Sequence, residues 1–179
     1  MKRLVPLVAF LLAASPAFAA HWTVDAAKSK LGFTATWSKQ PFGARFKTWK
    51  ASIDFDPADL AHATADVTVD IASEASDQSE LDDALKGAQG FAATQFPTAH
   101  FVTTGFRSKG GNAYVATGTL TLHGISKPVV MPFNLTITGK TAHMTGTAAL
   151  LRTDFGVGGE ATDPVAHAVI VTVDLTATQ

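Results

Sequence analysis

The sequence contains no cysteine among its 179 residues. This absence excludes disulfide bonds, thiol nucleophiles and thiolate metal ligands. Charge is sparse as well, because Lys, Arg, Asp and Glu make up 16% of the chain and the net charge is −1. Proteins that bind nucleic acid carry clustered Lys and Arg. The composition therefore argues against a nucleic-acid partner and leaves packing and backbone pairing to hold the fold.

Long apolar runs are scarce, and the one that stands out lies at the N-terminus. Lys2 and Arg3 precede an apolar run over 4–14, and Ala17-Phe18-Ala19 supplies the small-x-small pattern of a cleavage site. The run is shorter than the roughly 20 residues of a transmembrane helix. We expect residues 1–19 to be a cleaved signal peptide, with a retained membrane anchor as the alternative. Residues 20–179 would then be one exported domain with no membrane span.

Alternation with period two dominates the rest of the sequence. Leu31, Phe33 and Ala35 alternate with polar residues, and the same pattern recurs along the chain. This pattern is typical of half-buried β-strands. Residues 22–25 add a short leading segment to this pattern. We predict eight strands, at 29–38, 44–56, 63–72, 98–108, 112–123, 127–139, 141–152 and 165–178.

Turns and one irregular segment separate the strands. Turn chemistry indicates breaks at 40–43, 109–112, 138–140 and 156–164. Residues 73–94 lack the alternation. Ser79 as an N-cap, acidic residues in the first turn and apolar residues three to four apart predict a short helix at 79–87.

The element order predicts an all-β protein, either a closed antiparallel barrel or a sandwich, with one short helical crossover. Closure would remove the exposed edge strands. A barrel of about eight strands is just wide enough to be filled by side chains or to hold one slender ligand. Strands of about ten residues, at roughly 3.3 Å per residue, would make a tube long enough for an extended molecule.

Several ordered motifs carry a family resemblance. They are the opening at 22–33, the pair of motifs at 42–56, the Phe-Pro-x-x-x-Phe stretch at 96–101, the stretch at 118–129 and the Arg-x-x-Phe-Gly motif at 152–156. Together they resemble the YceI-like proteins over essentially the whole mature chain. The resemblance implies a periplasmic, eight-stranded antiparallel lipocalin-like barrel. It also implies binding or carriage of an amphipathic isoprenoid-like lipid, such as a polyprenyl or quinone tail, by a protein that is not an enzyme.

The crossover departs from the family pattern. The usual Arg-Asp-x-His-Leu is represented by 81–85, which lacks both the Arg and the His. A role for those two side chains at a ligand headgroup therefore does not carry over. The pattern is closer to the branch found beside b561-type membrane cytochromes. Interaction with such a cytochrome, an enzyme of unknown class and a homodimer are the alternatives that the sequence leaves open.

Phenylalanine is abundant and tyrosine is rare, with 12 Phe against one Tyr. The apolar faces also carry small residues such as Ala116 and Ala148, which would leave space for an apolar ligand unless large and small side chains interlock in a solid core. Phe91 and Phe96 of the crossover could plug the mouth of the barrel. The predicted lining residues are Phe33, Phe46, Phe55, Phe91, Phe101, Phe133 and Phe155.

Two polar residues are further ligand candidates. His123 precedes Gly124 in a turn between strands, and either a structural hydrogen bond or a ligand headgroup would account for it. Arg152 ends an apolar run and could contact an anionic headgroup or pair with Asp154 or Glu160.

No catalytic or metal motif is evident in the sequence. The six His residues show no local ligand spacing, and no Gly-x-Ser-x-Gly is present. We therefore expect no metal, no catalytic residue and no cofactor other than a bound isoprenoid lipid or quinone.

Overall fold

The structure is a computed structural model that describes residues 20–159 and 165–179. The predicted signal peptide at 1–19 lies outside the described residues, as does the stretch 160–164. Within the described part, no helix has the length and apolar character needed to cross a membrane.

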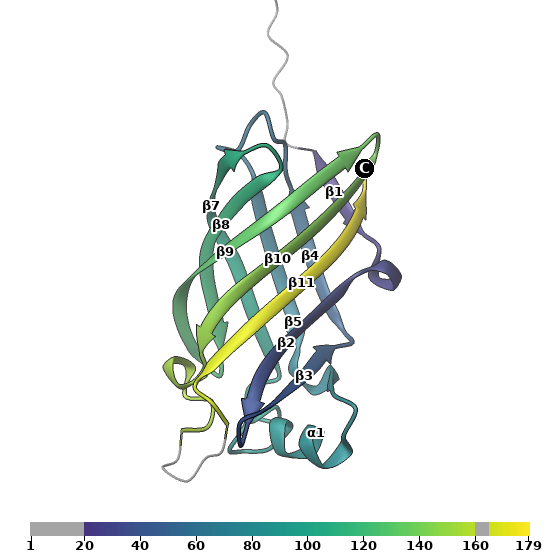
Figure 1. Ribbon diagram of the computed structural model, residues 1–179. Helices are drawn as coiled ribbons and strands as arrows, with labels where there is room; N and C mark the ends of the chain where they lie inside the picture. Colours follow the sequence, from purple (N-terminus) through teal and green to yellow (C-terminus); the bar gives the residue numbers. More distant parts are fainter. Residues whose placement is uncertain (1–19, 160–164) are drawn as a thin grey trace, which may run out of the picture.

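Strands dominate the chain (Figure 1). The first six are β1 (His21–Val24), β2 (Lys30–Trp37), β3 (Gln40–Phe46), β4 (Trp49–Asp54), β5 (Thr64–Asp70) and β6 (Glu74–Ala75). The other five are β7 (Thr98–Gly110), β8 (Ala113–Leu122), β9 (Ile125–Thr138), β10 (Thr141–Leu151) and β11 (Ala168–Thr178). The helical elements in the described residues are η1 (Ala26–Lys28), η2 (Ile71–Ser73), α1 (Ser79–Lys86) and η3 (Arg152–Phe155).

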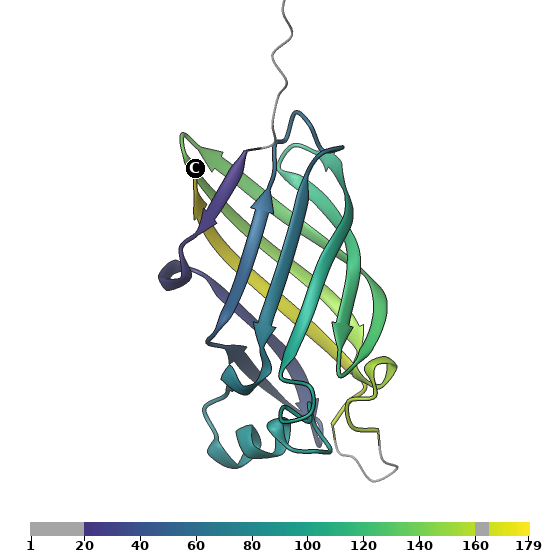
Figure 2. The same cartoon turned by 180° about the vertical axis from the view of Figure 1, so that it is seen from behind.

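The sheet closes on itself as a barrel (Figures 1 and 2). Its ring runs β1-β4-β5-β7-β8-β9-β10-β11, and β11 pairs back to β1. β2 continues beside β11 where β1 ends, so β1 and β2 share one position in the ring. The described strand pairings are antiparallel. This arrangement confirms the prediction of an eight-stranded antiparallel barrel.

The second predicted strand, 44–56, is wrong as a single element. The chain breaks at Lys47 and Thr48, so that β3 pairs with β2 while β4 pairs with β1 and β5. The predicted turn at 40–43 is also wrong, because those residues belong to β3. The turn lies at Ser38 and Lys39, whose φ angles of 47° and 69° suit a two-residue hairpin.

The crossover covers one end of the barrel. α1 lies at the end where β2 and β3 form their hairpin (Figure 2). The helix predicted at 79–87 is confirmed with its last residue at Lys86, but its N-cap is Gln78 and not Ser79. The side chain of Asp82 accepts hydrogen bonds from the backbone N and Oγ of Ser76 and so fixes the segment before the helix.

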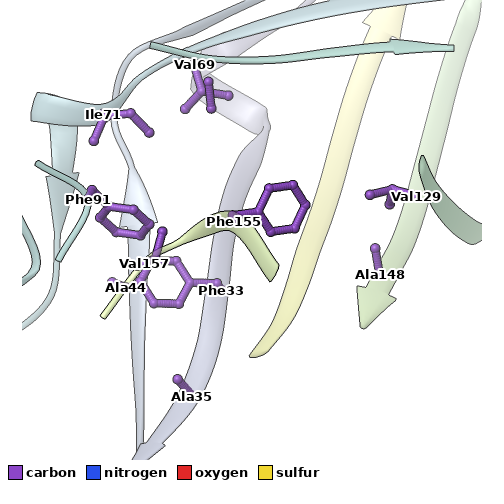
Figure 3. Close-up of a cluster of buried hydrophobic side chains, with 11 residues drawn as sticks. Phe33, Ala35, Ala44, Val69, Ile71, Phe91, Val129, Ala148, Phe155 and Val157 are labelled. Carbon is purple, nitrogen blue, oxygen red and sulfur yellow. The ribbon is translucent and has the colours of Figure 1, made fainter. Parts of the chain in front are cut away.

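Buried side chains form two clusters inside the barrel. The cluster at the α1 end includes Phe33, Ile71, Phe91 and Phe155. Figure 3 shows residues of this cluster arriving from different parts of the chain, with Phe91 of the crossover and Val157 after η3 beside Phe33 of β2. The cluster at the other end is built around Trp22, Phe55, Phe133 and Leu175. The apolar interior predicted from the alternation therefore has a packed region toward each end.

Candidate ligand-binding cavity

A cavity of about 270 Å³ lies inside the barrel. Its wall takes side chains from both buried clusters, so it extends along the interior between them. The wall is apolar except for Thr103, Arg152 and the indole N–H groups of Trp22 and Trp49. The Trp22 indole N–H donates to the carbonyl of Phe55 at 2.9 Å and is thereby satisfied. Such a lining favours an apolar chain, because a buried polar molecule would find few hydrogen-bond partners.

The structure brings the predicted phenylalanines together around this cavity. All seven line it: Phe33, Phe46, Phe55, Phe91, Phe101, Phe133 and Phe155. At the α1 end the rings of Phe33 and Phe91 have centroids 5.8 Å apart, and at the other end those of Phe55 and Phe133 are 6.3 Å apart. The crossover thus supplies part of the wall through Phe91. Contact of these rings with a ligand stays a prediction.

Four large aromatic side chains of the wall are absent from the predicted set. They are Trp22, Phe42, Trp49 and Phe106. The sequence predicts a turn at 40–43, whereas Phe42 lies in β3. Trp49 shares the alternation of β4, so its face could have identified it from the sequence.

Phe106 is missed for a different reason. Ala99, Phe101 and Thr103 of β7 line the cavity, so strict alternation would place Phe106 on the outer face. The pairing of β7 with β8 shifts register between Thr103 and Gly105. This bulge adds one residue and turns Phe106 inward.

Small inward-facing residues keep the cavity open. Ala116, Ala142 and Ala148 are buried in its wall. Gly118 serves a different purpose, because a Cβ there would lie 2.6 Å from the ring of Phe101. Gly118 therefore provides the space in which that ring packs.

Arg152 reaches the cavity wall, but its guanidinium is engaged with the backbone. Nη1 donates to the carbonyl of Val157 at 2.7 Å, Nη2 donates to that of Val165 at 2.5 Å, and Nε donates to that of Ala166 at 3.0 Å. The Arg152 side chain thus forms hydrogen bonds with Val157 on one side of residues 160–164 and with Val165 and Ala166 on the other. Of the two predicted partners, Glu160 lies outside the described residues.

His123 lies outside the cavity wall. It forms the turn between β8 and β9 with Gly124, and their φ angles are 52° and 74°. Its ring packs on Phe96 with centroids 4.4 Å apart. Phe96 is consequently placed on this turn and not in the cavity wall, so of the two residues predicted to plug the mouth only Phe91 lines the interior.

Glu74, a buried acid, lies in β6 next to α1 of the crossover. Glu74 of β6 is 1% exposed, and among the described residues neither carboxyl oxygen has a hydrogen-bond partner. Lys86 Nζ of α1 lies 4.0 Å from Oε2. Burial, assisted by the negative charge of Asp82, raises the pKa of Glu74 from 4.5 to about 7. No signal in the sequence distinguished this acid from its exposed neighbours.

Four histidines pair with aspartates on the exposed surface. The pairs are His21–Asp54, His62–Asp59, His100–Asp66 and His143–Asp174. Over residues 20–159 and 165–179, no three His, Asp or Glu side chains gather as a metal site.

Comparisons with known proteins point to one family. The sequence model described as YceI-like domain matches residues 22–177. A UPF0312 protein of Photorhabdus laumondii is 34% identical over 139 residues, which cover 74% of this chain and 70% of that protein.

Solved structures show the same fold. The crystal structure of Burkholderia cenocepacia BcnA has a TM-score of 0.83 and 33% identity, covering 87% of this chain and all of that one. A polyisoprenoid binding domain from Saccharophagus degradans has a TM-score of 0.68 at 14% identity, covering 90% of this chain and 99% of that one. This last likeness shows the fold alone.

Proposed function

Because the chain belongs to the family of proteins with a YceI-like domain, we propose that it binds and carries an amphipathic isoprenoid-like lipid inside its barrel. The polyprenyl or quinone tail would occupy the cavity, and the protein would perform no chemistry. The description of the Saccharophagus degradans domain as polyisoprenoid binding supports this ligand class. The signal pattern at 1–19 supports a periplasmic location for the mature chain.

The apolar cavity carries this proposal. Left empty, a cavity of about 270 Å³ would destabilise the fold by about 6 kcal/mol at about 24 cal/mol per Å³. Net stabilities of domains are only about 5–15 kcal/mol. A wall that leaves such a void is therefore best explained by an apolar occupant.

The binding energy is sufficient for a long apolar tail. Each buried CH₂ contributes about 0.8 kcal/mol, so one isoprene unit contributes roughly 3–4 kcal/mol. Association costs about 4–15 kcal/mol before net affinity appears. Several buried isoprene units would exceed this cost, whereas a small polar metabolite would not.

Native mass spectrometry and solvent extraction test the proposal. We expect protein purified without detergent to release a lipid with an isoprenoid chain when it is denatured in organic solvent. Absence of any lipid, together with failure to bind an added isoprenoid alcohol, would overturn the proposal.

A pair of adjacent alanines in β10 provides matched variants. Ala148 is buried in the cavity wall, whereas Ala149 is exposed on the outer face. Ala148→Leu should narrow the cavity and weaken isoprenoid binding by about tenfold, which corresponds to about 1.4 kcal/mol. Ala149→Leu should leave binding unchanged.

A second cavity variant guards against misfolding of the first. Ala142→Val, toward the other end of the wall, should also weaken binding. If folded Ala148→Leu, Ala142→Val and Ala149→Leu bind the isoprenoid with equal affinity, the lipid lies outside this cavity.

A b561-type cytochrome partner and a homodimer stay predictions.

A further inference from the structure

We infer that the polar end of the bound lipid is uncharged and lies in the pocket between the β2–β3 hairpin and α1. This inference rests on the proposed function and specifies the ligand class for the same site. It is carried by a second pocket next to the barrel cavity and by the charges around both.

The second pocket adjoins the cavity through one shared side chain. It has a volume of about 270 Å³ and lies between the hairpin residues 37, 38 and 40–42 and the start of α1 at Gln78 and Leu81. Phe42 lines both this pocket and the barrel cavity. The Phe42 ring lies 6.3 Å, between centroids, from that of Phe33 in the cavity wall. Phe42 is therefore the side chain that a ligand reaching from the barrel into this pocket would have to pass.

The two pockets differ in their polar groups. Ser38, Gln40 and Gln78 line the second pocket with hydroxyl and amide groups. Amides and hydroxyls both donate and accept hydrogen bonds, so they suit a ligand hydroxyl or carbonyl. The apolar parts of the pocket, Trp37, Phe42 and Leu81, would contact the first carbons of the chain.

The described walls hold no cation that is placed to receive a phosphate. The second pocket has none in its lining. In the barrel cavity the lining cation is Arg152, whose guanidinium nitrogens donate to the carbonyls of Val157, Val165 and Ala166. Sites that hold phosphate ends usually offer Arg or Lys donors for charge-assisted hydrogen bonds.

Charges near the second pocket also oppose an anion. Three cations lie in this region, Lys39 in the hairpin turn and Lys47 and Lys86 close enough to Asp82 to lower its pKa. Next to the pocket residues Gln78 and Leu81, however, the segment 77–83 carries four acids and no cation. Hydrogen bonds from Ser76 lower the pKa of Asp82, so this carboxylate stays negative. An anionic ligand end would therefore be repelled from the α1 side of the pocket.

Two probes with the same chain separate the alternatives. Binding of geranylgeraniol and of geranylgeranyl diphosphate can be followed by the fluorescence of Trp22 and Trp49, which line the cavity. We expect the alcohol to bind about tenfold or more tightly than the diphosphate, because the diphosphate would lose hydration without gaining a cation. Equal or tighter binding of the diphosphate would overturn the inference and leave the proposed function standing. Binding of neither probe would overturn the proposed function itself.

A gain of charge locates the polar end. Gln78→Lys should tighten diphosphate binding by about threefold or more and leave alcohol binding nearly unchanged, as expected for a partly exposed ion pair. Thr172→Lys, on the outer face of β11, is the control and should change neither affinity. If Gln78→Lys and Thr172→Lys behave alike toward the diphosphate, the polar end does not lie in this pocket.

Discussion

The guanidinium of Arg152 gives three backbone carbonyls their hydrogen bonds at the α1 end of the barrel. Removing it would break one buried hydrogen bond, to Val157, and two partly buried ones, and a buried group left unsatisfied costs about 1–3 kcal/mol. We expect Arg152→Ala to lower the free energy of unfolding by about 2–3 kcal/mol in a urea titration.

Arg152→Lys is the informative companion variant. An ammonium group lacks the planar fork of a guanidinium, so it should recover less than half of the lost stability. A fully stable Arg152→Ala protein with weakened lipid binding would instead make Arg152 a ligand contact.

Glu74 makes stability depend on pH. Its pKa is raised from 4.5 to about 7 by burial and by Asp82, against the opposing effects of Lys86 and Lys47. The folded state therefore holds the proton more tightly than the unfolded state. The stability gained from this proton is fully present below the unfolded pKa and is lost as pH rises through about 7.

Glu74→Gln tests this dependence because it keeps the shape of the protonated acid. At about 1.4 kcal/mol per pKa unit, the variant should be more stable than the parent by up to about 3 kcal/mol near pH 8 and nearly equal to it near pH 4, below the unfolded pKa. Denaturant unfolding at both pH values gives the comparison. Glu80→Gln, at an exposed position of α1, should show no such pH dependence, and a Glu74→Gln curve parallel to that of the parent would contradict the assignment.

At the scale of elements, the β8–β9 hairpin depends on two residues with positive φ. His123 and Gly124 have φ angles of 52° and 74°, which suit a two-residue turn that favours Asn-Gly. His123→Asn should therefore keep or raise stability, whereas His123→Val should lower the free energy of unfolding by about 1–2 kcal/mol. Both variants lose the ring contact with Phe96. The difference between their melting temperatures therefore reports the cost of a positive φ angle at residue 123. Reduced lipid affinity in His123→Asn alone would argue for a ligand contact.

Alternation with period two was sufficient to predict most barrel strands, but the prediction overlooked a change of phase inside one of them. In the predicted strand 44–56 the apolar residues lie at 44 and 46 and then at 49, 51, 53 and 55. The phase therefore changes at Lys47 and Thr48, where the backbone changes partners. Pro41 suggested a turn because proline cannot donate in a ladder. β3 tolerates it since, within the described pairings, its second partner β6 reaches only Arg45 and Phe46.

The residues of the cavity wall were predictable where the alternation of a strand is unbroken. Phe33 and Phe133 follow from uninterrupted alternation, and the structure places both in the wall. Phe106 could not be found in this way, because the bulge near Thr104 is a property of the pairing and not of local sequence. The partners of Arg152 lie in the loop that follows it, and Glu74 is affected by Asp82 and Lys86 of α1. Alternation within a strand reports neither environment.

At the scale of the whole molecule, the ligand should contribute to stability. A ligand present at about 100 times its dissociation constant stabilises the folded state by about 2.7 kcal/mol. For a domain of this size, about 2–4 °C of melting temperature corresponds to each kcal/mol. We therefore expect delipidated protein to melt about 5–10 °C below the natively purified protein.

Adding geranylgeraniol back should restore the melting temperature of the delipidated protein. Ala148→Leu should gain less than Ala149→Leu from this addition, because only the former narrows the cavity. Identical melting temperatures with and without lipid would contradict a stabilising occupant.

The first and last strands of the chain are neighbours in the ring. Thr23 pairs with Thr178, and β2 pairs with the middle of β11. During synthesis the growing chain can therefore reach only an open, curved sheet until its final residues appear. Deleting β11 would leave β10 unpaired on one side and β1 and β2 unpaired on the other, so the expected product is an aggregating sheet and not a smaller barrel.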